Sequence, residues 1–366
     1  MKFHPPKEIW IEQSVADTPL ARRVRSRAAA ARIEIIPDGE KTHQRFASEP
    51  SAIARGKRVL VLARLKGPFL KPCPCSPGVV SCGYDILNSA NNCSLGCTYC
   101  ILQHLMTNPA LVLYANIEDL EAQLDAEWRA RPRRRIRVGT GEFADSLELE
   151  PLTGCGAELV RAFARWPNAA LELKTKTDFV DSLIGLDPGA AVIAWSLNPP
   201  RIIREEERRA AGLEERLAAA RRAAQAGYRV GFHFDPMIHF PNWREEYAKV
   251  VDRVVEAVDP ARIAWVSLGA LRFPAKMKAT MRWRFPSTPI LDGEFVVGWD
   301  GKMRYFQPIR VEMFSFLAER LRQAAPGAAV YLCMETEDVW RRVFGRVPTT
   351  QEILDQTLTP ASAARG

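Results

Sequence analysis

The sequence predicts an α/β fold in which six parallel strands and their helical connections form a partial barrel, a (β/α)6 version of the TIM barrel. Short apolar segments alternate with amphipathic helical segments over residues 83–271, as in parallel sheets with helical crossovers. Six such units are too few for a closed eight-stranded barrel. The 366 residues are 47% hydrophobic and 26% charged, which fits a globular protein with a large core.

The six expected strands are short apolar runs rich in β-branched and aromatic residues. They cover residues 83–87, 135–139, 170–175, 191–197, 229–234 and 263–268. The helices between them have recognisable ends. Asn116 is expected to cap a helix over residues 117–128, and Gly227 to terminate a helix that begins near residue 213. Residues 243–258 predict a third helix, because apolar residues recur there every three or four positions.

We expect three segments along the chain. Residues 1–82 form an N-terminal α/β extension with strands over residues 8–13 and 58–65 and a helix ending near Arg32. Residues 83–285 form the partial barrel. Residues 286–366 form a small α+β extension: a hairpin with a two-residue turn at Asp300-Gly301, a helix over residues 312–323, a strand over residues 328–334 and a disordered tail over residues 357–366.

The localisation expected from the sequence is cytoplasmic, without membrane contact. No apolar run approaches the length of a membrane span. The first residues contain no apolar segment of the kind found in secretory signals. In a reducing compartment, eight cysteines are interpreted as thiols or metal ligands before disulfides.

The net charge of +8 is concentrated in basic runs over residues 22–27, 131–137 and 276–284. Such runs attract polyanions and favour a nucleic-acid partner. Solvated helix faces are the structural alternative. The last run is the better candidate because Trp283 and Phe285 lie among its basic residues and offer stacking surfaces.

The most specific motif is C-x3-C-x2-C, formed by Cys93, Cys97 and Cys100 directly after the first expected barrel strand. Ligands gather at the C-terminal ends of parallel strands, so this loop lies where a site is expected. Structural zinc usually takes four ligands in two close pairs. Three thiolates would instead hold three irons of a [4Fe–4S] cluster and leave the fourth iron open. A zinc loop or packed thiols are the alternatives.

With Tyr99 before its last cysteine, the motif resembles the signature of radical S-adenosylmethionine (SAM) enzymes. The resemblance implies that the open iron binds the amino and carboxylate groups of SAM. It also implies that an electron from the cluster cleaves the sulfonium to methionine and a 5′-deoxyadenosyl radical. A flavodoxin- or ferredoxin-type protein is implied as the electron donor.

More of the chain resembles one branch, the spore photoproduct lyase family. The likeness is carried by the segments EIWIE, CTYCILQ, LELKTKTDFVDSL, AGYRVGFHFDPMI and RFPAKMK. Members of this family are radical SAM enzymes that reverse a methylene-bridged thymine dimer in spore DNA without net consumption of SAM. The resemblance covers most of the chain and implies a cluster at the barrel mouth and a DNA lesion as substrate.

The resemblance also implies which residues contact SAM. Tyr99 would contact the adenine region, and Lys176 would reach the carboxylate. Ser196 and Asn198 would lie near the ribose. Glu142, in the GTGE segment after the second strand, would accept hydrogen bonds from the amino group. A core aromatic, a rim lysine and a helix-cap acid are the structural alternatives for Tyr99, Lys176 and Glu142.

Two positions depart from the family pattern. The lyases return a hydrogen atom to the product from a cysteine after the second strand, assisted by a tyrosine after the last cluster cysteine. In an ungapped alignment these positions are Glu142 and Ile101 here, whose O–H and C–H bonds are too strong for easy hydrogen-atom transfer. We therefore expect two consequences: a substrate other than the spore dimer, and consumption of SAM in each turnover. Cys333 is a candidate replacement donor, with buried packing as the alternative.

Other residues leave alternatives open. Cys73, Cys75 and Cys82 lie within ten residues and either bind an auxiliary metal or pack incidentally. His233 is either a substrate contact or a satisfied buried imidazole. At the level of function, the alternatives are a radical SAM enzyme acting on a small molecule or protein, and a non-catalytic, metal-bearing module that binds nucleic acid.

Overall fold

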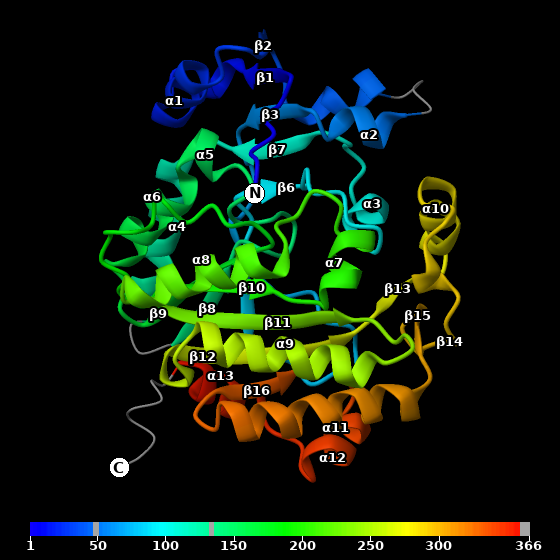
Figure 1. Cartoon of the computed structure of the whole chain (residues 1–366). Helices are drawn as coiled ribbons and strands as arrows, with labels where there is room; N and C mark the ends of the chain where they lie inside the picture. The colour runs from blue at the N-terminus through cyan, green and yellow to red at the C-terminus, as the bar shows by residue number, and fades with distance from the viewer. Residues whose placement is uncertain (47–50, 132–134, 359–366) are drawn as a thin grey trace.

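The computed structural model describes residues 1–46, 51–131 and 135–358. Its main element is a curved eight-stranded sheet with the order β16-β12-β11-β10-β9-β8-β5-β4 (Figure 1). Six neighbouring strands are parallel: β5 (Tyr84–Leu87), β8 (Ile136–Gly139), β9 (Ala169–Thr175), β10 (Val192–Ser196), β11 (Arg229–Met237) and β12 (Ile263–Ala270). These are the six strands expected from the sequence, and the partial barrel is confirmed.

One further strand extends each edge of this sheet. The strand β16 (Ala329–Leu332) pairs parallel with β12, so the strand expected in the C-terminal extension belongs to the barrel sheet. The strand β4 (Leu70–Pro72) pairs antiparallel with β5. The segments after β4 and β16 meet, with a bridge between Val79 and Thr336 and a 3.0 Å hydrogen bond from Val80 N to Glu335 O. The two edges of the curved sheet are therefore tied together.

A second sheet lies at the top of the view in Figure 1. Its order is β2 (Arg32–Ile36), β1 (Glu8–Glu12), β3 (Val59–Ala63), β7 (Leu111–Tyr114) and β6 (Ala90–Asn91), so it includes strands on both sides of the cysteine motif. The helix α1 (Pro19–Arg27) ends before Arg32, which the sequence had placed near the helix end. Arg32 instead starts β2, where its N–H donates to Lys7 O at 2.9 Å.

Helices cover the barrel sheet, as Figure 1 shows for α8, α9 and α11. They are α4 (Ile117–Ala130), α6 (Cys155–Phe163), α8 (Leu213–Gln225), α9 (Trp243–Ala257) and α11 (Gln307–Ala324). Gly227 follows α8 with φ of +97°, which confirms it as a terminator. The cap expected at Asn116 is wrong. Its buried amide accepts from Leu65 N at 2.9 Å and donates to Leu65 O at 3.1 Å, so the side chain satisfies the neighbouring backbone.

The C-terminal hairpin consists of β14 (Phe295–Val297) and β15 (Lys302–Tyr305), which joins β13 (Arg272–Pro274) in a small sheet. Gly298 N donates to Lys302 O at 2.8 Å, so three residues form the loop and the expected two-residue turn is wrong. Gly301 ends the loop with φ of +73°. The expected tail lies outside the described residues except for its first two, which belong to α13 (Thr350–Leu358).

The remaining elements are short. The other helices are α2 (Ala52–Gly56), α3 (Leu102–Leu105), α5 (Glu150–Thr153), α7 (Pro200–Glu206), α10 (Met277–Arg284) and α12 (Glu337–Phe344). Turns of 3-10 helix cover Gln13–Val15, Glu40–Phe46, Pro260–Arg262 and Pro289–Leu291. Within the three described ranges, no helix combines the length and apolar character needed to cross a bilayer.

Candidate active site

The cysteine motif forms a loop after β5 and β6, at the C-terminal end of the barrel sheet. Gly96 turns this loop with φ of +70°. Cys93 and Cys97 are buried, and each interacts electrostatically with Cys100, so the three thiols lie near one another. Burial raises the pKa of Cys93 and Cys97, which keeps both as thiols until a metal displaces their protons.

The donor set of the loop fits three corners of an iron–sulfur cluster. None of the eight cysteines is in a disulfide, so all three thiols are available. Over residues 1–46, 51–131 and 135–358, no three His, Cys, Asp or Glu side chains are arranged to hold a single metal ion. Three thiolates are the protein ligands of a [4Fe–4S] cluster with one open iron.

Two buried charged residues hold the cysteine loop in place, one from a segment before it in the sequence and one from a segment after it. Lys57 Nζ donates to Asn92 Oδ1 at 2.7 Å and to the carbonyl oxygen of Cys93. Glu148 Oε2 accepts from Ser94 N at 2.6 Å and lies 3.5 Å from Cys93 Sγ. Burial and Asp145 raise the pKa of Glu148 to about 7. Lys57 lies just before β3 of the second sheet, so both sheets position the loop.

A buried carboxylate, Glu207, organises the region beside the cysteine loop. It accepts hydrogen bonds from Tyr99 Oη, from Lys176 Nζ at 3.2 Å and from Asn198 Nδ2 at 3.2 Å. Its other oxygen is paired with Arg216, which is fully buried. Burial alone would raise the pKa of Glu207, but Arg216 and Lys176 lower it to about 2. Glu207 is therefore an ionised carboxylate inside the protein.

Three of the five residues implied as SAM contacts thus meet at one carboxylate that sequence reasoning missed. Asn198 is fixed further by Tyr247, whose hydroxyl donates to Asn198 Oδ1 at 2.7 Å. Ser196, the fourth of these residues, lies at the end of β10, and its carbonyl oxygen accepts from Arg216 Nη1 at 2.7 Å. We call Tyr99, Lys176, Ser196, Asn198, Glu207 and Arg216 the Glu207 group.

Glu142, the fifth residue, does not join this group. It follows β8 and forms an ion pair with Lys174, with Oε2 and Nζ 3.9 Å apart. A Cβ atom at Gly141 would lie 2.7 Å from Lys174 Cβ, so glycine is needed where the two segments cross. The negative charge of Glu142 contributes to the raised pKa of both Cys73 and Cys333. Glu142 therefore belongs with a different set of side chains.

That set includes the candidate hydrogen donor. Arg272 Nη1 lies 2.9 Å from Asp235 Oδ1, and Arg272 Nη2 lies 3.5 Å from Cys333 Sγ. Burial and Asp235 raise the pKa of Cys333, so it is a thiol. We call Glu142, Lys174, Cys73, Cys75, Cys333, Asp235 and Arg272 the Glu142 group. Ile101 is in neither group and packs partly buried against the main core.

His233 is a satisfied buried imidazole. Its Nε2 lies 2.6 Å from Glu172 Oε1, inside the barrel. The other Glu172 oxygen is 2.9 Å from Arg137 Nη2, which also donates to Tyr331 Oη at 2.7 Å. Arg137 lies over the ring of Trp265, 4.0 Å from its centroid. These groups fill the interior across β8, β9, β11, β12 and β16 and leave His233 a structural role.

The basic run over residues 276–284 forms α10, which stands apart at the right of the view in Figure 1. Trp283 is 68% exposed, as a stacking surface requires. Phe285 is buried beneath the guanidinium groups of Arg208 and Arg284, each 4.9 Å from its ring, so its expected stacking role is wrong. Of the other basic runs, residues 22–27 lie in α1, and residues 132–134 lie outside the described residues.

A parallel partial barrel with a three-cysteine loop at the C-terminal end of its sheet defines the class of radical SAM enzymes. Within that class, this chain belongs to the spore photoproduct lyase family, whose model, "Spore photoproduct lyase", matches residues 4–294. The family resemblance inferred from the sequence is confirmed.

Relatives and solved structures agree with this assignment. The chain is similar to the spore photoproduct lyase of Clostridium acetobutylicum, with 23% identity over 78% of this chain and 84% of the relative. It is 26% identical to that of Bacillus subtilis, over 79% and 85% of the two chains. A solved cysteine-to-alanine mutant of spore photoproduct lyase matches with a TM-score of 0.80 and 22% identity, over 91% of this chain and 100% of that chain. The fold of the solved lyase is therefore shared by most of this chain.

Proposed function

We propose that this chain is a radical SAM enzyme that binds a [4Fe–4S] cluster through Cys93, Cys97 and Cys100 and acts on a nucleic-acid lesion. The carrying observation is that Tyr99, on the cysteine loop, reaches the same buried carboxylate as Lys176 and Asn198. A cluster held by the loop would supply the electron that cleaves the sulfonium of SAM. A flavodoxin- or ferredoxin-type protein would deliver that electron.

The Glu207 group supports SAM binding through its charge balance. Lys176 shares Glu207 Oε1 with Tyr99 and Asn198, whereas Arg216 pairs with Oε2. Lys176 can therefore turn toward an incoming carboxylate while Glu207 keeps Arg216 as its counter-ion. The lysine is 14% exposed, compared with 0% for both Glu207 and Arg216, so it is the accessible charge of the group.

Two features support a nucleic-acid substrate. A related spore photoproduct lyase has been solved with bound AdoMet and dinucleoside spore photoproduct, and its fold matches this chain with a TM-score of 0.79. Exposed apolar side chains also lie beside basic ones on α10 and on the β14–β15 hairpin. These two elements are linked through β13, which pairs with β15 and precedes α10 in the chain. Trp283, Val297 and Trp299 are each more than half exposed there. Aromatic surfaces among cations are suited to unstacked bases and phosphates.

We expect the reaction to differ from that of the lyases in the step that returns a hydrogen atom to the product radical. Glu142 is paired with Lys174, and Ile101 is packed against the core, so the positions aligned with the family's cysteine and tyrosine carry no weak X–H bond. We infer that SAM is consumed in each turnover. Cys333 stays our candidate donor, since it is a thiol in the same group as Glu142.

Anaerobic reconstitution with iron and sulfide, followed by dithionite and SAM, tests the proposal. We expect four irons per chain, a reduced-cluster EPR signal that SAM alters, and release of 5′-deoxyadenosine. A bound zinc ion with no deoxyadenosine would refute the enzyme and favour a metal-bearing binding module. Cluster chemistry with no salt-dependent binding to DNA would instead favour a small-molecule or protein substrate.

A further inference from the structure

The Cys73-Pro74-Cys75 segment after β4 forms a tight turn that brings two thiols together. Cys75 N donates to Cys73 O at 2.8 Å, which closes a three-residue γ-turn. Pro74 at its centre has a ring-restricted φ close to that of the inverse γ-turn. The turn draws the flanking residues together, so that the Cys73 and Cys75 thiols are close enough for each to affect the pKa of the other.

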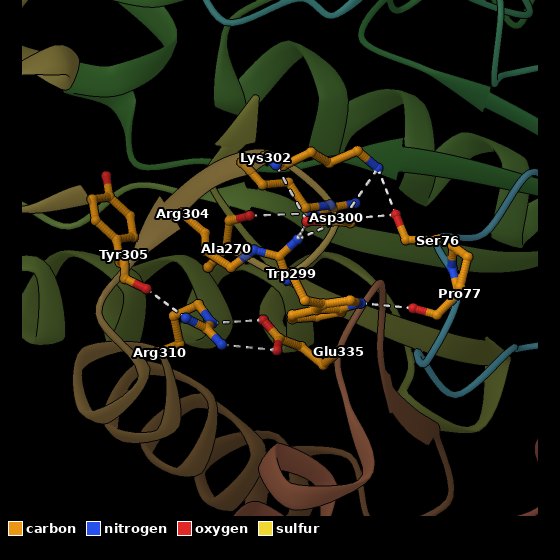
Figure 2. Close-up of polar contacts among 11 residues, drawn as sticks. Ser76, Pro77, Ala270, Trp299, Asp300, Lys302, Arg304, Tyr305, Arg310 and Glu335 are labelled. Carbon is orange, nitrogen blue, oxygen red and sulfur yellow. Dashed lines mark hydrogen bonds and ion pairs between the residues drawn. The ribbon is translucent and has the colours of Figure 1, made fainter. Parts of the chain in front are cut away.

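Contacts on both sides hold this turn in place. Cys73 N donates to Tyr84 O at 3.0 Å, which continues the β4–β5 ladder. On the other side, Ser76 Oγ donates to Asp300 Oδ2 at 2.7 Å. The indole of Trp299 donates to Pro77 O, also at 2.7 Å (Figure 2). The thiol pair is therefore preorganised by the hairpin and the barrel edge.

The surroundings make the two thiols unequal. The neighbouring Cys73 lowers the pKa of Cys75 most, and Ser81 and Arg272 act in the same direction against burial and the charge of Glu142. Cys75, burial and Glu142 raise the pKa of Cys73. Cys75 is therefore the more acidic thiol of the pair. Both residues are half-buried, so small reagents can reach them.

We propose that Cys73 and Cys75 form a redox-active dithiol that exchanges with small-molecule disulfides. The Cys75 sulfur attacks the disulfide, forms a mixed disulfide and releases one thiol. Cys73 then loses its proton, attacks the Cys75 sulfur and releases the second thiol, leaving a Cys73–Cys75 disulfide. The protein loses two hydrogens and the small disulfide gains them, so atoms and electrons balance.

Other thiols nearby do not have this arrangement. The Val79–Thr336 bridge register places Cys82 opposite Cys333, but burial raises the pKa of both. Cys155 lies at the start of α6, and burial raises its pKa to about 12. Neither Cys82 nor Cys155 has its pKa lowered by a neighbouring cysteine. Both therefore serve as internal references for thiol reactivity.

The test uses the reconstituted protein with its cluster cysteines occupied, treated with oxidised glutathione and mapped by peptide mass spectrometry. We expect the peptide with residues 73 and 75 to lose two hydrogens, and dithiothreitol to reverse the change. Cys73→Ser should stop at the glutathione adduct on Cys75, whereas Cys75→Ser should prevent both products. Cys155→Ser is the matched control and should leave oxidation unchanged.

A second readout does not depend on disulfide formation. Iodoacetamide should label Cys75 faster than Cys82 or Cys155 at neutral pH, and Cys73→Ala should slow that labelling because the neighbouring thiol that lowers the pKa of Cys75 is lost. Equal labelling rates for Cys75 and Cys155, or a disulfide that joins Cys82 to Cys333, would overturn the proposal. Neither readout involves SAM cleavage, so both are independent of the proposed function.

Discussion

The Glu207 group and the Glu142 group both follow parallel strands of the barrel, but they are built differently. In the Glu207 group, four polar side chains converge on one buried carboxylate whose charge is balanced by Arg216. In the Glu142 group, a half-buried carboxylate lies 3.9 Å from Lys174 and acts electrostatically on thiols from two separate segments. One group is closed and the other is partly open.

Under the proposed function, this difference would separate the cofactor site from the substrate site. The closed group contains the residues that match the family pattern for SAM, and its polar atoms are already paired. The open group contains Glu142, where the pattern of the lyases fails, together with accessible thiols. Under the proposed function, the closed group would serve radical generation, and the open group would serve the step in which this chain departs from the lyases.

Replacement of Cys97 by alanine should have the largest effect, because it removes one of three ligands from the proposed cluster. Iron content after reconstitution should fall sharply, and 5′-deoxyadenosine formation should be lost. Cys155→Ala removes a thiol outside both groups and should leave iron content and SAM cleavage unchanged. Full iron content in the Cys97 variant would contradict the assignment of the cluster to this loop.

Replacement of Glu207 by glutamine should come next. It leaves Arg216 buried without a counter-ion, which we expect to cost about 3–5 kcal/mol of unfolding free energy. Urea unfolding measures this cost, and calorimetry of SAM binding tests whether the affinity falls as well. The double variant Glu207→Gln with Arg216→Met should recover part of the stability but not the SAM affinity. Full SAM affinity in either variant would mean that the Glu207 group does not form the SAM site.

Replacement of Trp283 by alanine tests the exposed surface on α10. Loss of a stacking side chain should weaken single-stranded DNA binding by about 1–3 kcal/mol, measured by fluorescence anisotropy. Ile35→Ala removes an exposed apolar side chain from β2 of the second sheet and is the control. Equal losses in the two variants would indicate that α10 has no special role in binding.

The fold was predictable where the signal was local. Six strands follow from apolar runs between helical segments, and Gly227 ends α8 as expected. The incorrect predictions concern a helix cap and a hairpin turn whose structure depends on contacts with residues distant in the sequence. Asn116 binds the backbone of Leu65 instead of capping its helix. The hairpin loop is held by contacts of Trp299 and Asp300 with the segment after β4.

The candidate site was likewise predictable only where its residues lie in a recognisable local pattern. Tyr99, Lys176 and Asn198 stand beside recognisable strand ends or cysteines, so the sequence resemblance reached them. Glu207 lies in a run of charged residues over 204–209 that looks like a solvated helix face. Arg216, on the next helix, and Lys176, after β9, supply the positive charges that stabilise this buried carboxylate. No local pattern distinguishes it from Glu205, which is only half-buried.

The smallest expected effect is on the pH dependence of the unfolding free energy. It comes from His233, which lies inside the barrel and belongs to neither group. Burial lowers its pKa below the value of about 6.5 for an exposed histidine. The unfolded chain therefore binds a proton that the folded chain does not, so this contribution to stability is present above that value and is lost as the pH falls. Glu172, whose pKa is lowered by Arg137 and His233 against the effect of burial, adds a similar loss only at more acidic pH.

His233→Gln, which keeps a donor toward Glu172, should flatten the decline in unfolding free energy between about pH 7 and pH 5. Urea unfolding at several pH values measures the slope. His43→Gln is the control, since His43 is exposed and its Nδ1 lies 3.0 Å from the Glu40 carbonyl oxygen. If wild type and His233→Gln lose stability in parallel over this range, His233 is not held neutral in the folded protein. Glu172 would then have to balance two buried cations, Arg137 at one oxygen and His233 at the other.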